Sequence, residues 1–234
     1  AHLGNYWAGP EGGLALDSAG RIYVPDTGNH RIQIYNSGGT YHGTFGSYGS
    51  GNDQFQAPTG VAIHPTSGDI FIADRWNHRV QVYDSSWNYQ ATLGTTGVSG
   101  SDNNHFNGPT GVAVSASGNV YISDAWNYRI QECSVSGGGG ACTTFAGETG
   151  VIGADFGHLG QPAGVAVDSS GRVYVADPWN TRVQVFDSSG AYLTSIAGAD
   201  GWGADSGKLR SPEDVALDDQ GNVYVTDRIN HRVL

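Results

Sequence analysis

The stretch Asp124-Ala-Trp-Asn127-Tyr-Arg129 is one of five copies of a signature, Asp-x-x-Asn-x-Arg, that decides the fold. The copies run from Asp26 to Arg31, Asp74 to Arg79, Asp124 to Arg129, Asp177 to Arg182 and Asp227 to Arg232. A second marker, a proline ahead of a short apolar run, recurs in step at Pro10, Pro58, Pro109, Pro162 and Pro212. A fixed period of about fifty residues indicates a repeat architecture.

Each period contains short runs of β-branched and aromatic residues separated by turn formers. In the fourth period the runs are Gly164–Val167, Arg172–Ala176, Arg182–Phe186 and Tyr192–Ile196. Such runs predict antiparallel strands joined by tight turns. Four strands per period of this length predict an all-β fold, a β-propeller of four-stranded antiparallel blades. We expect one domain over residues 1–234, with repeats at approximately 5–46, 47–94, 95–147, 148–198 and 199–234.

The turn sequence Asn-His-Arg followed by a hydrophobic residue resembles the signature of the NHL-repeat family, in the form found in extracellular bacterial and archaeal proteins. An aromatic residue or leucine three positions before the marker proline also fits, at Phe55, Phe106, Leu159 and Leu209. The resemblance covers essentially the whole chain. Tyr128 and Thr181 replace the histidine in two copies, which argues against one shared chemical role for this position.

The fifth repeat is shorter than the others, because it stops at Val233-Leu234, early in its expected third strand. The segment Ala1-His-Leu-Gly4 resembles the strand end Ala91-Thr-Leu-Gly94. We therefore expect a five-bladed ring with an incomplete last blade, or five blades of a six-bladed ring. As an alternative, another chain could complete the last blade by strand addition, which would make the protein an assembly subunit.

The charge balance limits the partners. The chain has 22 acidic and 11 basic residues, a net charge of −11, and Lys208 is its one lysine. A phosphate backbone requires a basic stripe, which is missing, so we exclude nucleic acid. Anionic membrane is disfavoured for the same reason, and no apolar run is long enough for membrane insertion. A cation, a carbohydrate or a protein surface remains as a partner.

Cys133 and Cys142 are the only cysteines and bracket a glycine-rich turn. Two adjacent antiparallel strands could place them within disulfide reach, and two free buried thiols are the alternative. A disulfide, together with abundant Ser, Gly, Asn and Asp, indicates an extracellular protein, secreted or at the cell surface.

The signature itself is best explained as structure. Asp and Arg lie five residues apart across a turn, and Asn tolerates the left-handed backbone of such turns. Arg presents a rigid fork that can hold a carboxylate and nearby carbonyls. Because a catalytic pair needs to occur only once, a pair present in every repeat is expected to be a structural clasp.

We expect binding residues among the positions that differ between the repeats. Trp76, Trp126 and Trp179 occupy the signature turns of three consecutive repeats, on the face that also carries the long connections between blades. They could form an aromatic arc that stacks on sugars or captures a peptide, or each could pack on its neighbouring blade. Tyr48 and Trp202 in the connections add to this candidate binding face.

Acidic residues gather near the expected channel mouth. Glu11 and Glu213 follow the first and last marker prolines, and Asp214 adds a third carboxylate. If the ring closes, these acids approach one another. With the hydroxyls of Thr59 and Thr110 they could hold a hard cation such as Ca²⁺, and solvated surface acids are the alternative. We expect that no cofactor is required.

The sequence contains no Ser-His-Asp arrangement and no glycine-rich phosphate loop. The leading hypothesis is therefore a non-enzymatic secreted propeller that binds a ligand or assembles. The alternative is a metal-dependent lyase or hydrolase, similar to peptide-amidating lyases or lactonases, with its site at the channel mouth. The segment Ser101–Pro109 is similar to part of the peptide-amidating lyases, which share the NHL propeller and use histidine-bound zinc. Only His105 matches.

Overall fold

The computed structural model describes residues 13–136, 139–197, 203, 205 and 207–234, and these form short antiparallel sheets. Blade 1 contains β1 (Ala15–Leu16), β2 (Ile22–Asp26), β3 (Arg31–Tyr35) and β4 (Tyr41–Phe45). Blade 2 contains β7 (Pro58–Ile63), β8 (Ile70–Asp74), β9 (Arg79–Tyr83) and β10 (Tyr89–Gly94). Each sheet follows chain order from its first strand to its last.

The later blades repeat this plan. Blade 3 contains β11 (Pro109–Val114), β12 (Asn119–Asp124), β13 (Arg129–Ser136) and β14 (Gly139–Ala146). Blade 4 contains β15 (Val165–Val167), β16 (Val173–Asp177), β17 (Arg182–Phe186) and β18 (Tyr192–Ile196). Blade 5 has three strands among the described residues, β19 (Pro212–Leu217), β20 (Val223–Asp227) and β21 (Arg232–Val233).

The second and third strands of every blade are joined by a single 3₁₀ turn inside the signature. These turns are η1 (Thr27–Asn29), η2 (Arg75–Asn77), η3 (Ala125–Asn127), η4 (Pro178–Asn180) and η5 (Arg228–Asn230). The connection from blade 1 to blade 2 adds a small parallel pair, β5 (Ser47–Tyr48) and β6 (Gln54–Phe55). None of the described helices is long and apolar enough to span a membrane.

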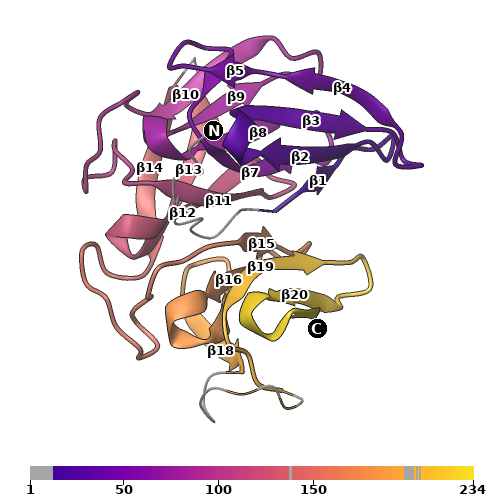
Figure 1. The fold of residues 1–234 in the computed structure, drawn as a ribbon. Helices are drawn as coiled ribbons and strands as arrows, with labels where there is room; N and C mark the ends of the chain where they lie inside the picture. The colour runs from indigo at the N-terminus through magenta and orange to yellow at the C-terminus, as the bar shows by residue number, and fades with distance from the viewer. Residues whose placement is uncertain (1–12, 137–138, 198–202, 204, 206) are drawn as a thin grey trace, which may run out of the picture.

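The blades are arranged around a central channel, with the first strand of each blade innermost. β7 contacts β11, β11 contacts β15 and β15 contacts β19, so that the blades follow one another in chain order (Figure 1). The predicted fold class is confirmed: the chain is an all-β, five-bladed propeller, and its last blade has three described strands.

Strand alternation places side chains in the cores between blades. On β7, Val61 packs with Tyr23 of blade 1, whereas Ala62 packs with Val112 of blade 3. Gly60 shares the side of Ala62, and a Cβ there would collide with the carbonyl oxygen of Thr110. Small residues on this side therefore let the backbones of neighbouring blades approach closely near the axis.

The channel mouth is bound together by hydrogen bonds that step from blade to blade. Thr59 Oγ1 donates to the Thr110 carbonyl oxygen at 3.0 Å, and Thr110 Oγ1 donates to the Pro162 carbonyl oxygen at 3.1 Å. The amide of Gly164 donates to the Glu213 carbonyl oxygen at 2.8 Å. Both threonines are fully buried, because they lie between two blades.

The seam between blade 5 and blade 1 differs from the other interfaces. Near the axis the two blades meet, since the side chain of Asp214 lies against Gly13. Farther out, Tyr224 of blade 5 is 47% exposed, whereas its counterpart Tyr121 of blade 3 is 2% exposed. Leu14 of blade 1 is likewise 57% exposed, although its counterparts in the other blades are buried. Among the described residues, apolar side chains are therefore exposed on both sides of the seam.

Candidate functional site

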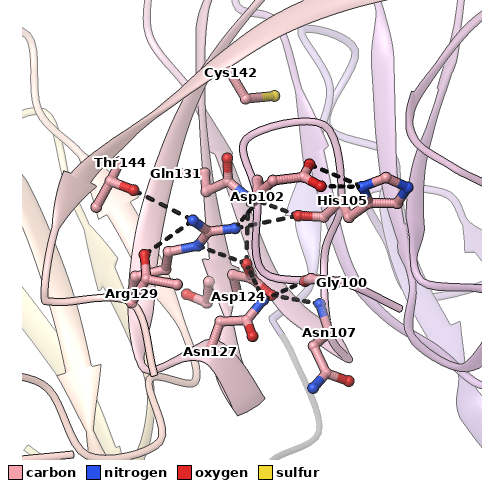
Figure 2. A network of polar contacts seen from close by, with 12 residues as sticks. Gly100, Asp102, His105, Asn107, Asp124, Asn127, Arg129, Gln131, Cys142 and Thr144 are labelled. Carbon is pink, nitrogen blue, oxygen red and sulfur yellow. Dashed lines mark hydrogen bonds and ion pairs between the residues drawn. The ribbon is translucent and has the colours of Figure 1, made fainter. Parts of the chain in front are cut away.

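The signature of blade 3 forms a compact polar network (Figure 2). Asp124 Oδ2 accepts hydrogen bonds from Arg129 Nε and Asn127 Nδ2, each at 2.8 Å, and Oδ1 accepts the backbone amide of Asn107 at 2.6 Å. The left-handed backbone expected of the signature Asn falls instead on the residue after it, because Asn127 lies in the 3₁₀ turn and Tyr128 has φ of 57°. The turn geometry therefore brings the three signature side chains to one point.

The same network binds the connection that enters the blade. Arg129 Nη2 donates to the carbonyl oxygens of Asp102 and His105 at 2.8 and 3.2 Å, and Asn127 Nδ2 donates to the Gly100 carbonyl oxygen at 2.7 Å (Figure 2). Blades 2 and 4 repeat the pattern: Arg79 holds Gly51 and Gln54, and Arg182 holds Ala154, Asp155 and His158. These acceptors in the incoming connections are main-chain carbonyls, whereas Nη1 of Arg79 and of Arg129 donates to the side-chain hydroxyls of Thr96 and Thr149 in the connections that follow.

Burial of the network changes along the chain. Asp74, Asp124 and Asp177 are fully buried, and burial raises the pKa of each carboxyl in spite of the hydrogen bonds it accepts. In Asp26, burial alone would raise the pKa, but the hydrogen bonds from Arg31 and Gln33 outweigh it and lower the pKa. Asp227 of blade 5 likewise has a lowered pKa, because hydrogen bonds from its backbone and side-chain partners outweigh burial.

The histidine of the signature makes the same structural hydrogen bond in two blades, which is distinct from the shared chemical role that its replacement elsewhere argues against. His30 Nδ1 accepts the backbone amide of Ala57 at 3.0 Å, and His78 Nδ1 accepts the amide of Gly108 at 3.2 Å. Each histidine therefore binds the connection that enters the next blade. Partial burial lowers the pKa of His78, which favours the neutral ring that accepts this hydrogen bond.

The candidate aromatic residues are only partly brought together. The rings of Trp76 and Trp126 lie 5.2 Å apart, and Trp126 also packs on Gly108. Trp179 is 63% exposed, and the ring of Tyr48 packs at a tilt against His30, so neither makes a ring contact with that pair among the described residues. Trp202 lies outside the described residues.

The structure adds Arg75, a residue that the sequence analysis missed. Its guanidinium carbon lies 5.6 Å from the ring centre of Trp76 and 5.2 Å from that of Trp126. Arg75 opens η2, where the other blades have Thr27, Ala125, Pro178 and Arg228. The residue at this position differs from blade to blade, and this variation inside the repeated signature is the signal that could have identified Arg75.

The acidic residues of the mouth are described in part. Glu213 Oε1 accepts the hydroxyl of Ser211 at 2.8 Å and lies 3.5 Å from Arg228 Nη1. The carboxylate of Asp214 lies against Gly13 and Gly164 at the channel, and burial there raises its pKa to about 6. Glu11, the third acid of the expected cation site, lies outside the described residues.

The hydroxyls expected to complete that cation site are already engaged. Thr59 and Thr110 donate to carbonyl oxygens of the next blade, as described above. Within the described part of the chain, no group of three or more His, Cys, Asp or Glu side chains is placed to hold a metal ion. His105 instead pairs with the exposed Asp102 at 2.8 Å.

The structure contains the predicted disulfide. Cys133 and Cys142 face each other across β13 and β14 with Cα atoms 4.1 Å apart. Both half-cystines are buried in the core between blades 2 and 3, beside Leu93. The bond therefore closes a hairpin at the outer edge of blade 3 and lies far along the sheet from the innermost strand β11.

These observations define the class of protein. It is a β-propeller in which each blade carries one polar network, and tryptophan, arginine and glutamate side chains lie on the face formed by the 3₁₀ turns and the connections between blades. The model of the NHL repeat matches residues 12–35, 55–83, 106–133, 159–186 and 209–234. The chain belongs to the NHL repeat family. A comparison with curated protein sequences gives no match.

Solved structures share the fold at low identity. An auxiliary nutrient binding protein from Bacteroides ovatus superposes with a TM-score of 0.70 at 18% identity, over 95% of this chain and 57% of that one. A chain of a nidogen/laminin complex gives 0.68 at 21% identity, over 92% and 71%. A gluconolactonase from Xanthomonas campestris gives 0.65 at 17% identity, over 92% and 68%. The chain thus spans little more than half the length of the nutrient binding protein.

Proposed function

We propose that this chain is a non-enzymatic binding propeller that takes its ligand on the loop face, the surface formed by the 3₁₀ turns and the connections between blades. One observation carries the proposal. The signature side chains of blades 2 to 4 are already hydrogen-bonded to the connections. Trp76, Trp126 and Arg75 lie together beside the channel mouth and take no part in that network. Clustered tryptophan and arginine are the residues most enriched at binding hot spots.

The setting and partner classes follow from the same features. A disulfide in the hairpin of blade 3 supports an extracellular location, secreted or at the cell surface. Carbohydrate and protein are the partner classes that exposed indoles serve well. Nucleic acid is disfavoured by the net charge of −11. The nutrient binding and nidogen/laminin structures show that proteins with this fold include binding modules.

The test is a binding measurement on the loop face. Intrinsic tryptophan fluorescence is recorded during titration with neutral oligosaccharides (malto-, cello- and xylo-hexaose) and with a basic protein, lysozyme. We expect saturable binding of at least one probe, weakened more than tenfold by Trp76→Ala with Trp126→Ala. Tyr41→Ala, an exposed aromatic of the outer strand β4, is the control and should bind as the parent does. Binding that survives the double substitution would contradict the proposal.

Self-association is a second candidate, because the seam leaves Leu14 and Tyr224 exposed beside a blade with three described strands. Strand addition to β21 by another copy would extend that blade. Sedimentation velocity between about 1 and 100 µM tests this candidate, and Val233→Lys on the edge strand should abolish any dimer. A monomer at every concentration would exclude it.

The enzymatic alternative rests on the neighbouring acids Glu213 and Asp214 at the channel mouth. With Glu11 they would supply carboxylate oxygens for Ca²⁺, which prefers such ligands. Calorimetric titration with CaCl₂ tests the metal, and Glu213→Gln should weaken it at least tenfold. A lyase or hydrolase activity would further require that metal-loaded protein turn over a lactone or an amide-type substrate, with the apo-protein as control.

A further inference from the structure

Arg75 is a buried guanidinium without an acceptor. It is 9% exposed, its side chain donates no hydrogen bond to any described residue, and Nε is enclosed by protein atoms without a partner. Nine of the other basic side chains lie within ion-pair distance of a carboxylate. The remaining one, Arg210, is exposed to solvent. Because a buried charge without a partner costs free energy, Arg75 calls for an explanation.

The walls around Arg75 are aromatic. Trp76 and Trp126 lie 5.6 and 5.2 Å from its guanidinium carbon and stabilise the cation through their ring faces. Burial lowers the pKa of Arg75, and the nearby Glu213 acts in the opposite direction, so the guanidinium stays charged at neutral pH. The indoles remove water from the cation, which strengthens any hydrogen bond that a bound anion accepts from it.

Glu213 supplies the second half of the arrangement. It is 8% exposed, and Oε2 has no hydrogen-bond partner in the described structure, although Oε1 accepts from Ser211. Arg75 belongs to blade 2 and Glu213 to blade 5, which are not successive blades. The two charges influence each other but lie beyond ion-pair distance. An unfilled donor and an unfilled acceptor thus face the same mouth from different blades.

We propose that Arg75 and Glu213 together bind a small carboxylate that carries an adjacent hydrogen-bond donor, as in an α-hydroxy or α-amino acid. The ligand's planar carboxylate accepts parallel hydrogen bonds from the guanidinium fork, and its hydroxyl or ammonium group donates to Glu213 Oε2. This inference rests on the proposed function, since it assigns a ligand to the loop face. It also explains why Arg75 and Glu213, two oppositely charged groups buried at the mouth, are not paired with each other, although Oε1 of Glu213 already contacts Arg228.

The arrangement predicts a specific order of affinities. Acetate offers the carboxylate but no donor, and glycerol offers donors but no carboxylate, so each satisfies half of the site. L-Lactate and glycine satisfy both halves. The net charge of −11 disfavours simple anions, so acetate gains little from general electrostatics. We expect L-lactate or glycine to bind at least tenfold more tightly than acetate and glycerol.

The experiment is a titration of the purified chain with these four probes, followed by tryptophan fluorescence and calorimetry, with three variants. Arg75→Met should weaken the preferred probe at least tenfold and leave the melting temperature unchanged or higher, because it removes a buried, unpaired charge. Arg75→Lys keeps the charge but loses the fork, so it should also bind at least tenfold more weakly. Arg210→Met removes an exposed arginine and is the matched control.

Glu213→Gln tests the second half, and it should reduce the advantage of L-lactate or glycine over acetate to less than threefold. The inference is overturned if the parent chain binds neither compound, or if Arg75→Met and Arg75→Lys bind as the parent does. In that case, oligosaccharide or lysozyme binding that depends on Trp76 and Trp126 would still support the loop face as the binding surface. Failure of all probes would remove both proposals.

Discussion

Blade 3 and blade 1 carry the same signature in different surroundings. In blade 3, Asp124 and Arg129 are buried and the arginine holds two carbonyl oxygens of the incoming connection. In blade 1, the side chains of Asp26 and Arg31 are 18% and 39% exposed, although the Asp–Arg distance is again 2.8 Å. The pKa of the aspartate is raised in blade 3 and lowered in blade 1. The same Asp–Arg pair therefore has a different aspartate pKa in the two blades, because the protein covers it to a different extent.

The same contrast extends to the apolar residues of the two regions. Tyr121 and Val112 in blade 3 are nearly inaccessible, whereas Leu14 of blade 1 and Tyr224 of blade 5 are about half exposed at the seam. The position of a residue in the repeat is thus not enough to predict how much its side chain contributes to the free energy of unfolding. The contribution depends on whether a neighbouring blade or connection packs against it.

The largest expected effect is the loss of the buried arginine. Arg129→Met leaves Asp124 charged, buried and without its main partner, so the free energy of unfolding should fall by about 3–5 kcal/mol. Arg31→Met in blade 1 should cost no more than about 1 kcal/mol, because that pair is partly solvated. Urea denaturation of both variants gives the comparison. Equal losses would show that the connection contributes nothing to the difference.

Removing the disulfide should have the next largest effect. Cys133→Ala with Cys142→Ala frees a short loop, since the residues are 9 apart in sequence, and the loss should be about 2–3 kcal/mol. The same loss is expected when the parent chain is unfolded in the presence of a reductant. A reduced parent as stable as the oxidised one would contradict this prediction.

The carboxyl at the seam should produce a pH dependence of opposite sign to that of ordinary salt-bridged acids. The pKa of Asp214 is raised from 3.8 to about 6, so the folded chain holds this proton more tightly than the unfolded chain. The stabilising contribution is complete below about pH 4 and is lost as the pH rises to about 6. Asp214→Asn should remove this dependence and be about 1–2 kcal/mol more stable than the parent at pH 7.

Thermal unfolding between pH 4 and pH 7 provides that measurement. Asp26, whose pKa is lowered, serves as the internal contrast: its contribution is present above pH 4 and is lost as the pH falls further. If Asp214→Asn and the parent show the same pH profile over this range, the carboxyl does not titrate where the structure places it.

The smallest effect is expected at the uncovered apolar positions. Leu14→Ala should change the free energy of unfolding by no more than about 0.5 kcal/mol, because the side chain is 57% exposed. Val112→Ala at the matching position of blade 3 should cost about 1–3 kcal/mol. Chemical denaturation of the two variants side by side decides the point. A large loss for Leu14→Ala would mean that the seam is covered in solution.

Much of the fold could be predicted, because the same pattern of strands and turns occurs in five repeats of the sequence. The strands from Tyr89 and from Tyr192 begin where their alternating residues begin. The disulfide could also be anticipated, because register across a single hairpin is a local property.

The mouth was harder to predict, because it is made by residues distant in the sequence. Thr59 and Thr110 were expected to serve a cation, but their hydroxyls are used between blades, and this depends on the spacing of neighbouring backbones near Gly60. Arg75 was overlooked because the signature containing it was treated as uniform. Its meeting with Glu213 requires the ring to curve, which no local pattern encodes.

The choice of main-chain carbonyls as acceptors in the signature network has a consequence for how such proteins can change. Arg129 and Arg182 hold the connection that enters their blade through its main-chain carbonyls. Arg129 adds one side-chain contact, to Oγ1 of Thr149 in the connection that follows. Away from these contacts, the connections can therefore change sequence while the arginines keep them anchored through the main chain. For engineering, this means that the propeller can serve as a scaffold for varied loops, and an exposed connection residue such as Asn103 is a natural position to diversify.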